Sequence, residues 1–447
     1  MLTSKRFVSE FGKTSAQSGG ADSMFRGAAV GQPTLLVVTM IAFWVSELLP
    51  GQIAGFNISG WLWVGILLVA TSVIVRNPTG IRFPILLWTP WIVYLIARVK
   101  DWSLLGVQST LQIILPVIVA AAASTTRSSI GFLEKVDKWM NIFLLLMLFW
   151  YIFVGIPWIL QDIENSGGIG AGVMALIFQA YFLCRYLLLG YRRWDLIGAV
   201  CAVCVPVGLT LRGPILGAVA LFILVLAPLS LWKRVGMGIL VVFLCVGLFY
   251  TPRVQLKMFI SGQGSLTDIR KDNKNLNSSG RSWMAETLEL GLGDSVWLGH
   301  GANSAGDALV AAGFTLREAH NDWLRIRYCY GRVGVIIFAL TMIAQVYLLL
   351  LTGRNKTPRV QVLLLAGASC FIPFSVVMLT DNILVYCQYF TVPHFLLIGY
   401  GYSVGNPVED FDGVNNSARL VLNNGRRGNQ RLPYTRRNRA PQSVVDS

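Results

Sequence analysis

The chain has 447 residues, of which 54% are hydrophobic and only 13% are charged, and its mean hydropathy is +0.60. This composition is far too apolar for a soluble protein of such a length, so the sequence predicts an all-α polytopic membrane protein. The net charge of +15 does not indicate a nucleic-acid-binding protein, because the cations are distributed over separate loops and not gathered on one domain.

The chain begins with a hydrophilic segment, residues 1–32. This segment contains lysine and arginine but no continuous apolar core followed by a small-residue cleavage site. We therefore interpret it as a cytoplasmic N-terminal arm and not as a cleaved signal peptide.

Apolar runs of roughly 17 to 25 residues are long enough to cross a bilayer as helices. They predict about twelve transmembrane helices, at residues 33–50, 58–75, 83–97, 104–123, 139–160, 171–190, 195–211, 213–231, 235–250, 330–352, 360–380 and 383–404. The first nine fall within residues 33–250 and the last three within residues 330–404. A large hydrophilic loop, residues 251–329, separates the two groups.

The tail, residues 405–447, is rich in Asn, Gly and Arg and is predicted to be disordered. It either contacts anionic lipid headgroups or serves only as a determinant of topology.

The cations indicate an orientation in the membrane. Besides the tail, they lie in the loops after even-numbered spans, at Arg76 and Arg82, Arg127, Lys135 and Lys138, Arg192 and Arg193, Lys233 and Arg234, and Arg354, Lys356 and Arg359. The loops GQIAGFN (51–57), QDIENSGGIG (161–170) and LTDN (379–382), after odd-numbered spans, are neutral or acidic. By the positive-inside rule both termini are cytoplasmic and the large loop faces outward. One short loop departs from this rule, because it places Arg98 and Lys100 outside.

Arg212 lies at the outer boundary of a span, in the turn TLRGP. An arginine near hydrocarbon costs on the order of 2.5 to 3.5 kcal/mol at a helix centre and less near an interface. Such a residue is kept for a partner or an anionic ligand, or it extends to the lipid headgroups. Both interpretations of Arg212 remain open from the sequence alone.

Arg281 lies in the outer loop, in the stretch NSSGRSWMAETLEL. Ser278 or Ser279, together with the following glycine, is expected to open a helix there. The arginine is either a solvated residue that pairs with Glu286 or a binding residue for an anion.

Residues 317–334 read REAHNDWLRIRYCYGRVG and precede an apolar span. If this stretch is helical, then His320, Leu324 and Arg327 share one face, at i, i+4 and i+7. A neutral imidazole can take a proton from a hydroxyl, while guanidinium groups neutralise phosphate oxygens. The alternative is that His320 is an ordinary polar residue on a solvated helix end.

Metal catalysis has little support in the sequence. His300 and His320 are the only outer histidines, and neither an H-E-x-x-H motif nor a clustered carboxylate set accompanies them. We therefore expect chemistry that depends on neither a metal nor another cofactor.

Four stretches carry a family resemblance when they are taken in order. They are LRGPILGAVA (211–220), GRSWMAETLEL (280–290), WLGHGANSAG (297–306) and AHNDWLRIRYCYGRVGVIIF (319–338). The series resembles the bacterial superfamily of O-antigen ligases and O-antigen or exopolysaccharide polymerases. Its outer loops contain a Gly-Arg followed by a Trp, a short Gly-rich turn, and a His-Asn before a helix that ends in Gly-x-x-Gly. The chain departs from the usual pattern at His300, which stands inside the Gly-rich turn.

The resemblance implies a membrane fold similar to class C glycosyltransferases. It also implies transfer of a glycan from an undecaprenyl-pyrophosphate donor to an acceptor hydroxyl at the periplasmic face of the bacterial inner membrane. On this view Arg212 and Arg281 bind the donor pyrophosphate and His320 activates the acceptor. The candidate supporting residues are Arg317, Asn321, Arg327 and Asp381.

The preferred interpretation is a polymerase that joins lipid-linked repeat units of a capsule, exopolysaccharide or O-antigen. A ligase that moves finished glycan onto lipid A core has the same donor chemistry, and the motifs do not separate the two. A transporter of lipid or polysaccharide is a further alternative, against which the spans show few interior charges apart from Arg185, which can extend to the inner interface. A structural scaffold would not need Arg212 at the membrane boundary.

Overall fold

A computed structural model describes residues 33–404 with the exception of residues 49–51, 54–55, 101, 127–129, 162–167, 223–229, 271–272, 274 and 279. The predicted N-terminal arm and the predicted basic tail, 405–447, lie outside the described residues.

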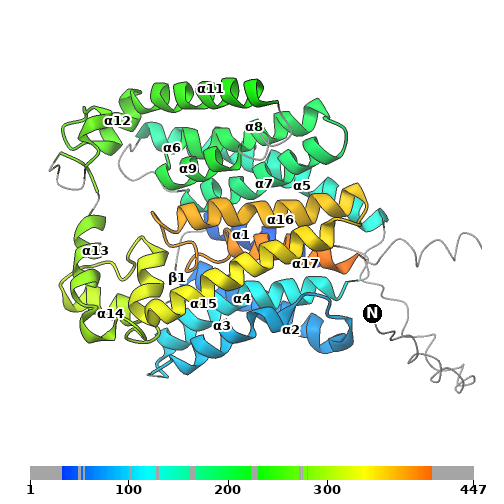
Figure 1. Ribbon diagram of the computed structural model, residues 1–447, viewed down its shortest axis with the longest axis horizontal. Helices are drawn as coiled ribbons and strands as arrows, with labels where there is room; N and C mark the ends of the chain where they lie inside the picture. Colours follow the sequence, from blue (N-terminus) through cyan, green and yellow to red (C-terminus); the bar gives the residue numbers. More distant parts are fainter. Residues whose placement is uncertain are drawn as a thin grey trace, which may run out of the picture.

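The first part of the chain is a series of mostly apolar helices (Figure 1). They are α1 (Thr34–Leu48), α2 (Ile58–Arg76), α3 (Ile85–Ala97), α4 (Leu104–Ser124), α5 (Ile130–Trp150), α6 (Ile156–Gln161), α7 (Ile169–Leu188), α8 (Arg193–Gly208), α9 (Arg212–Leu221) and α11 (Leu231–Phe249). A π-helical turn, Tyr151–Gly155, joins α5 to α6, and a 3-10 turn, Pro78–Gly80, precedes α3. A short antiparallel hairpin, β1 (Gln52–Ile53) and β2 (Phe56–Asn57), joins α1 to α2.

The hydrophilic loop and the last part of the chain are also helical. The loop contains α12 (Pro252–Met258), α13 (Arg281–Leu290) and α14 (Ser304–Ala311), with 3-10 turns at Leu266–Asp268 and Gly293–Ser295. The chain then continues through α15 (Asp322–Gly353), α16 (Pro358–Val377) and α17 (Thr391–Ser403). We call residues 378–390 the α16–α17 linker, because they form turns and not a helix.

The protein is a polytopic membrane protein. Among the described residues, six helices are long and apolar enough to cross a bilayer, namely α4, the helix over residues 131–155, α7, α11, α15 and α16. Shorter apolar helices, α1, α2, α3 and α9, accompany them. Helices suit these sequences because hydrocarbon offers no partner to a free backbone N–H or C=O, and a helix satisfies both internally.

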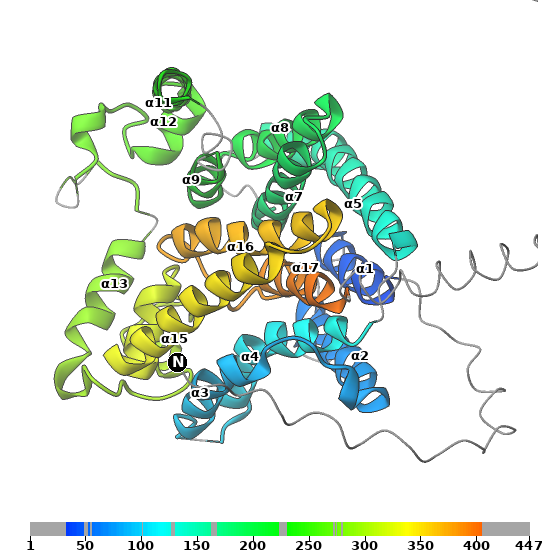
Figure 2. The ribbon, with the colours of Figure 1, turned by 45° about the vertical axis from the view of Figure 1, so that its right-hand side comes forward.

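The centre of the molecule is a packed bundle of small and aromatic side chains. Figure 2 shows α16 and α17 in the middle, with α7 and α9 on one side and α4 and α15 on the other. At the contact between α4 and α17, a side chain at Gly399 would collide with the carbonyl oxygen of Ala120. Small residues therefore bring these two helices together closely, as is common where apolar helices pack in lipid.

Each predicted span corresponds to a helix, but four boundaries differ markedly from the prediction. The fifth helix begins at residue 130 instead of 139, and the tenth begins at Asp322 instead of 330. The last helix begins at Thr391 instead of 383, because the apolar residues before it belong to the α16–α17 linker, which is buried within the protein. The predicted span at 213–231 corresponds to α9, which ends at Leu221.

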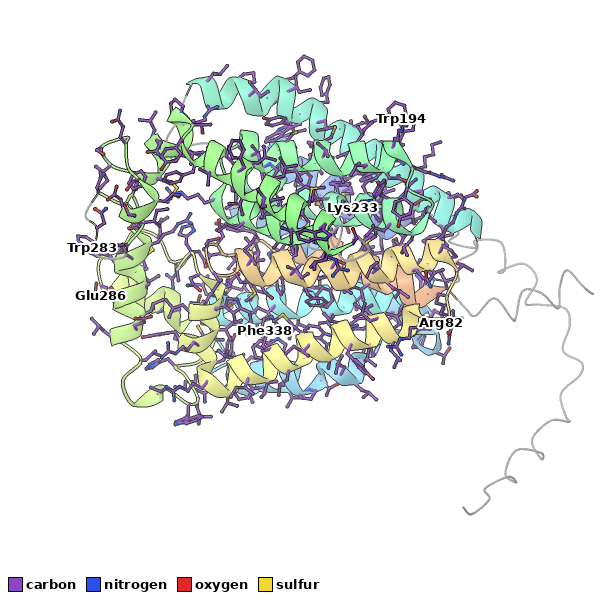
Figure 3. The ribbon with its side chains drawn as sticks, turned by 45° about the horizontal axis from the view of Figure 1, so that its top comes forward. Arg82, Trp194, Lys233, Trp283, Glu286 and Phe338 are labelled. Atoms are coloured by element: carbon purple, nitrogen blue, oxygen red, sulfur yellow. The ribbon has the colours of Figure 1, made fainter. Side chains whose placement is uncertain are left out.

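The loops gather at two opposite ends of the bundle. Figure 3 shows Arg82 at one end and Trp283 and Glu286 of α13 at the other. At the Arg82 end, the guanidinium donates to the carbonyl of Ser403 at 2.7 Å, and Lys356 donates to that of Val404 at 3.1 Å. Loops that follow even-numbered spans therefore lie at the same end of the bundle. The alternation of cationic and neutral loops along the sequence predicts this arrangement.

The exceptional loop with Arg98 has a role at the opposite end. The guanidinium of Arg98 donates to the carbonyl of Gly299 at 2.6 Å, and the backbone N–H of Ala302 donates to the carbonyl of Arg98 at 3.0 Å. Arg98 therefore holds the hydrophilic loop onto the bundle.

The expectation that Arg185 extends to the interface is wrong. Its side chain is buried on α7, where its Nε lies 3.1 Å from Asp195 of α8 and its Nη1 lies 3.5 Å from Asp137 of α5. Charged residues are thus paired inside the bundle, contrary to what the sequence suggested. The cluster joins three helices, and it contains two carboxylates for one cation.

Candidate functional site

His320 precedes α15 instead of lying on it. Its backbone is left-handed, with φ 49°, and the helix begins two residues later at Asp322. Asn321 is the N-cap, since its side-chain oxygen accepts from the backbone N–H of Leu324 at 2.9 Å. The prediction that His320 shares a helical face with Leu324 and Arg327 is therefore wrong. A non-glycine residue in this region carries a strain of about 1–2 kcal/mol, and such residues cluster at functional sites.

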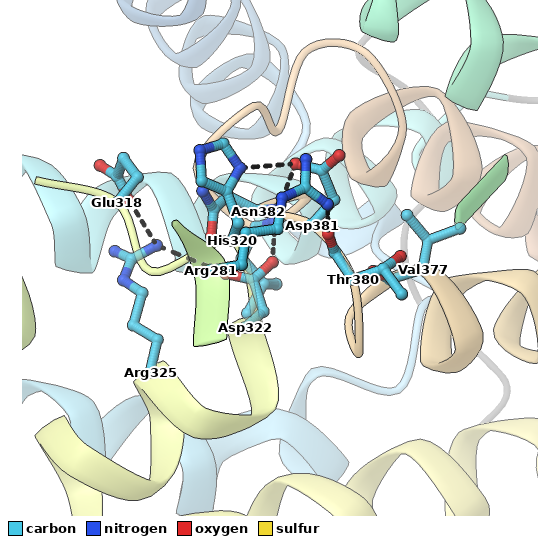
Figure 4. Close-up of polar contacts among 10 residues, drawn as sticks. Arg281, Glu318, His320, Asp322, Arg325, Val377, Thr380, Asp381 and Asn382 are labelled. Atoms are coloured by element: carbon cyan, nitrogen blue, oxygen red, sulfur yellow. Dashed lines mark hydrogen bonds and ion pairs between the residues drawn. The ribbon is translucent and has the colours of Figure 1, made fainter. Parts of the chain in front are cut away.

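The imidazole of His320 faces the α16–α17 linker. Its Nδ1 lies 3.4 Å from Oδ1 of Asp381, whose side chain is only 6% exposed while that of His320 is 22% exposed (Figure 4). The same carboxylate oxygen accepts from the backbone N–H of Asn382 at 2.9 Å. A proton on Nδ1 directed at this carboxylate leaves the lone pair of Nε2 available, which is the arrangement of an oriented general base.

Arg281 reaches the same linker from the hydrophilic loop. It is the first residue of α13, after Gly280 in a left-handed conformation, so the expected helix start at this position is correct. Its Nη1 donates to the carbonyl of Thr380 at 2.6 Å (Figure 4). No ion pair between Arg281 and Glu286 occurs among the described residues.

Arg212 is the first residue of α9 and follows a strained turn. Thr210, two residues earlier, has φ 52°, which is unusual for a β-branched residue. The guanidinium of Arg212 donates to the carbonyl of Asn277 at 3.0 Å and to that of Lys257 on α12. Backbone carbonyls neutralise no charge, so Arg212 remains a cation available to an anion.

Lys257 was not identified from the sequence. Burial, together with the smaller effect of the neighbouring charges of Arg212 and Arg253, lowers the pKa of its ammonium group to about 8. The two neighbouring cations place an excess of positive charge around Lys257, which a bound anion would relieve. The sequence signal was weak, because Lys257 is one of several cations in a hydrophilic loop.

Arg281 and the residue that follows Arg212 approach one linker residue from different elements. A side chain at Gly213, next to Arg212, would collide with the hydroxyl of Thr380, whose carbonyl binds Arg281. Thr380 in turn precedes Asp381, the partner of His320. The structure therefore brings Arg212, Arg281 and His320 to one short stretch of the linker.

A buried ionic cluster fixes this linker against the start of α15. Asp322 donates its backbone N–H to the carbonyl of Met378 and accepts from the backbone N–H of Leu384, both at 2.8 Å. Arg325 lies 3.6 Å from Asp322 and 3.9 Å from Glu318, and its Nη2 donates to Ser109 at 2.7 Å. These contacts fix the position of His320 relative to Asp381. This role of Glu318 and Asp322 was not predicted from the sequence.

The Gly-rich turn of the hydrophilic loop packs on a kink in α15. Gly331 has φ 68°, and the kink frees the carbonyls of Tyr328 and Cys329, which accept from the N–H groups of His300 at 2.9 Å and Gly301 at 2.7 Å. The imidazole of His300 stacks on Tyr328 with ring centroids 4.6 Å apart. His300 therefore has a packing contact in this position.

The remaining candidates have other partners. Arg317 forms an ion pair with Asp307 of α14, and both side chains are well exposed. Arg327 lies on the first turns of α15 and has no ion pair with any described residue. Among the described residues, no group of three His, Cys, Asp or Glu side chains is placed to hold a metal ion.

The arrangement as a whole brings cations and a base to neighbouring residues of one linker. Arg212, Arg281 and Lys257 can stabilise a polyanion, and His320 with Asp381 can take a proton from a hydroxyl beside it. This combination suits a transfer in which an anionic group leaves and a hydroxyl attacks.

Comparison with known proteins agrees with this chemistry. Residues 197–339 match the family model described as O-antigen ligase. The match begins within α8, ends within α15, and includes Arg212, Arg281 and His320. A search of curated proteins found no match to the chain. Residues 197–339 thus form an O-antigen ligase family domain.

Proposed function

We propose that the protein polymerises oligosaccharide repeat units carried on undecaprenyl pyrophosphate, at the periplasmic face of the bacterial inner membrane. The product would be a capsule, an exopolysaccharide or an O-antigen. The observation that carries this proposal is the meeting of Arg212, Arg281 and His320 at residues Thr380 and Asp381 of the linker.

The proposed topology has about twelve transmembrane helices and a fold similar to class C glycosyltransferases. Residues 33–250 contain the first nine helices and residues 330–404 the last three, while residues 251–329 form the periplasmic loop. The termini, 1–32 and 405–447, are cytoplasmic. The segregation of Arg82 and Lys356 to the end opposite α13 supports this assignment.

In the proposed reaction the cations bind the donor. The pyrophosphate would accept hydrogen bonds from Arg212 and Arg281, with Lys257 beside it. As the bond between the sugar anomeric carbon and the phosphate oxygen breaks, the electron pair remains on the lipid pyrophosphate. Fixed guanidinium groups stabilise this developing charge by several kcal/mol in a site partly closed to water.

His320 would activate the acceptor. Its Nε2 takes the proton of an acceptor hydroxyl, and the oxygen forms the new glycosidic bond at the anomeric carbon. Asp381 orients the ring through Nδ1 and stabilises the imidazolium that forms. The proton then passes to solvent, so the products are the elongated glycan and free lipid pyrophosphate. No metal ion is needed for any of these steps.

A ligase is the second candidate, because the matching family is described as O-antigen ligase. It would use the same donor, cations and base, and its acceptor would be lipid A core. The two functions therefore differ only in the acceptor.

Deletion of the gene and sizing of the lipid-linked glycans separates the two. Single repeat units on undecaprenyl pyrophosphate would support the polymerase. Full-length glycan stranded on the carrier, with bare lipid A core, would support the ligase instead. An unchanged glycan profile in the deletion strain would contradict both, and a His320→Ala gene that restores the profile would exclude the proposed site.

A further inference from the structure

The Gly-rich turn that packs on the kink in α15 begins with two large apolar side chains that the protein leaves uncovered. Trp297 is 60% exposed and Leu298 is 52% exposed. Exposure of single apolar residues is common on soluble proteins and carries little information by itself. What these two side chains face is decided by the depth of the turn relative to the bilayer.

The uncharged stretch of α15 shows where the hydrocarbon layer ends. Between Arg332 and Arg354 the chain contains no charged residue. Its apolar part, residues 333–351, rises about 28 Å as a helix. This length matches the roughly 30 Å of a bilayer's hydrocarbon core. Arg332 therefore lies at the boundary of the core, on the side of the hydrophilic loop.

The Gly-rich turn is fixed at this boundary by hydrogen bonds of the backbone. The N–H of Arg332 donates to the carbonyl of Val296 at 2.9 Å, and the N–H of Val333 donates to that of Trp297 at 3.1 Å. The guanidinium carbon of Arg332 also lies 5.3 Å from the centroid of the Trp297 ring. Trp297 is thus at the same depth as the first residues of the apolar stretch.

Trp297 also continues the lipid-facing surface of α15. Below Arg332, which is itself exposed, large exposed side chains recur at intervals of three and four residues, at Ile336, Leu340, Ile343, Tyr347 and Leu350. Residues at this spacing share one face of a helix, and an exposed apolar face on a membrane-spanning helix contacts lipid. Because Trp297 stacks on Arg332, its ring extends this face at the loop end.

The connection between α3 and α4 has the same character. Arg98, directly after α3, donates to the carbonyl of Gly299 in the turn at 2.6 Å. Trp102 and Leu104, a few residues later at the start of α4, are both well exposed. Exposed apolar residues therefore also occur where α3 ends and α4 begins, next to the residue that binds the turn.

We propose that the Gly-rich turn inserts into the headgroup region of the bilayer, with Trp297 and Leu298 on the upper acyl chains and Arg332 among the phosphate groups. Tryptophan is favoured at this depth because its ring is apolar and its N–H is polar. An arginine beside it carries its charge toward the headgroups, and Arg332 forms no ion pair with any described residue. The partner of this surface is the lipid bilayer, whichever acceptor the protein uses.

The test is photochemical labelling of the purified full chain in vesicles of phosphatidylglycerol and phosphatidylethanolamine. A small fraction of the lipid carries a diazirine on the upper part of one acyl chain, and labelled residues are located by mass spectrometry of peptides. Trp283 on α13 is the matched control, because it is 73% exposed but lies at the outer extremity of this end of the molecule (Figure 3). We expect Trp297 to be labelled at least about tenfold more than Trp283, since only the former reaches the interface. Ile336 on the lipid-facing side of α15 is the positive control.

Trp297→Asp tests the same contact with a variant. A carboxylate is disfavoured at the edge of the hydrocarbon, so the labelling of Leu298 should fall about fivefold or more while that of Ile336 stays unchanged. Trp283→Asp should alter neither. Equally weak labelling of Trp297 and Trp283 in the parental protein, with Ile336 labelled, would overturn the proposal without any variant. Crosslinks from Trp297 to a second copy of the chain, in place of lipid, would also contradict it. None of these readouts requires glycan transfer, so the lipid contact and the proposed function can fail separately.

Discussion

The individual site residues were visible in the sequence as polar exceptions to an apolar pattern. Arg212 interrupts two spans, and His320 is one of three histidines in the chain. The linker around Thr380, where these residues meet, could not be predicted from the sequence. Arg281 binds the backbone carbonyl of Thr380, and every residue type has such a carbonyl. Lys257 was missed for a related reason, since its importance arises from the charges folded around it.

Arg281→Lys tests how the donor is held. Lysine keeps the positive charge but loses the planar fork that can bind two phosphate oxygens and the carbonyl of Thr380 at once. We expect the variant to insert normally and to lose most transfer activity, by about tenfold or more. The measurement is donor turnover at matched membrane expression, with Arg317→Lys as the control, because Arg317 pairs with Asp307. Parental turnover in Arg281→Lys would show that charge alone suffices.

The lowered pKa of Lys257 predicts that donor binding depends on pH. Its pKa is lowered to about 8, so its charge is lost as the pH rises from 7 to 9, whereas the pyrophosphate diester keeps its charge. Since only the charged form attracts the donor, the donor KM should rise over this interval. Lys257→Gln should have a raised KM at pH 7 that no longer changes up to pH 9. Parallel pH profiles for the two proteins would remove Lys257 from the donor site.

At the scale of the elements, helices were easier to predict than the places where they stop. Apolar runs located every helix of the bundle, but the start of α15 was misplaced by treating HNDWLRIRYCY as one helix. Asn321 as N-cap was a readable signal for a start at Asp322. The kink at Gly331 was less accessible, because it depends on the Gly-rich turn that packs against it from another segment.

Gly331→Ala tests that packing. Alanine in a left-handed conformation costs about 1–2 kcal/mol, and its methyl group would also collide with the carbonyl oxygen of Trp297. We expect the hydrophilic loop to detach from α15, with faster proteolysis of residues 251–321 and loss of transfer. Gly353→Ala in the same helix meets only ordinary contacts with Leu364 and serves as the control. Equal protease resistance of the two variants would refute this role of Gly331.

At the scale of the whole molecule, the alternation of charged loops predicted which loops share an end. It could not predict which helices pack together, as the pairing of Arg185 with Asp137 and Asp195 illustrates. Nor could it predict that the α16–α17 linker turns into the protein, because its apolar residues look like the start of a span. Burial inside a folded protein and burial in lipid favour the same residue types.

Cysteine accessibility tests the orientation of the molecule. A cysteine at Asn275 or Asn303, in the hydrophilic loop, should react with a membrane-impermeant thiol reagent added to intact spheroplasts. One at Lys356, in a loop at the opposite end, should react only after permeabilisation. Labelling is compared with the parental protein, which has seven cysteines of its own. Reaction at Lys356 in intact spheroplasts would reverse the topology.

The most direct test of the active site is transfer by the His320→Ala protein, purified as the full chain and assayed in EDTA with a lipid-linked donor. If His320 is the base and no metal takes part, the parental protein should be active in EDTA. The variant should bind donor normally and lose about 10²- to 10⁴-fold in transfer. His300→Phe, which keeps the ring stacked on Tyr328, is the matched control and should remain active. Near-parental transfer by His320→Ala, or activity abolished by EDTA and restored by divalent cations, would contradict the proposed mechanism.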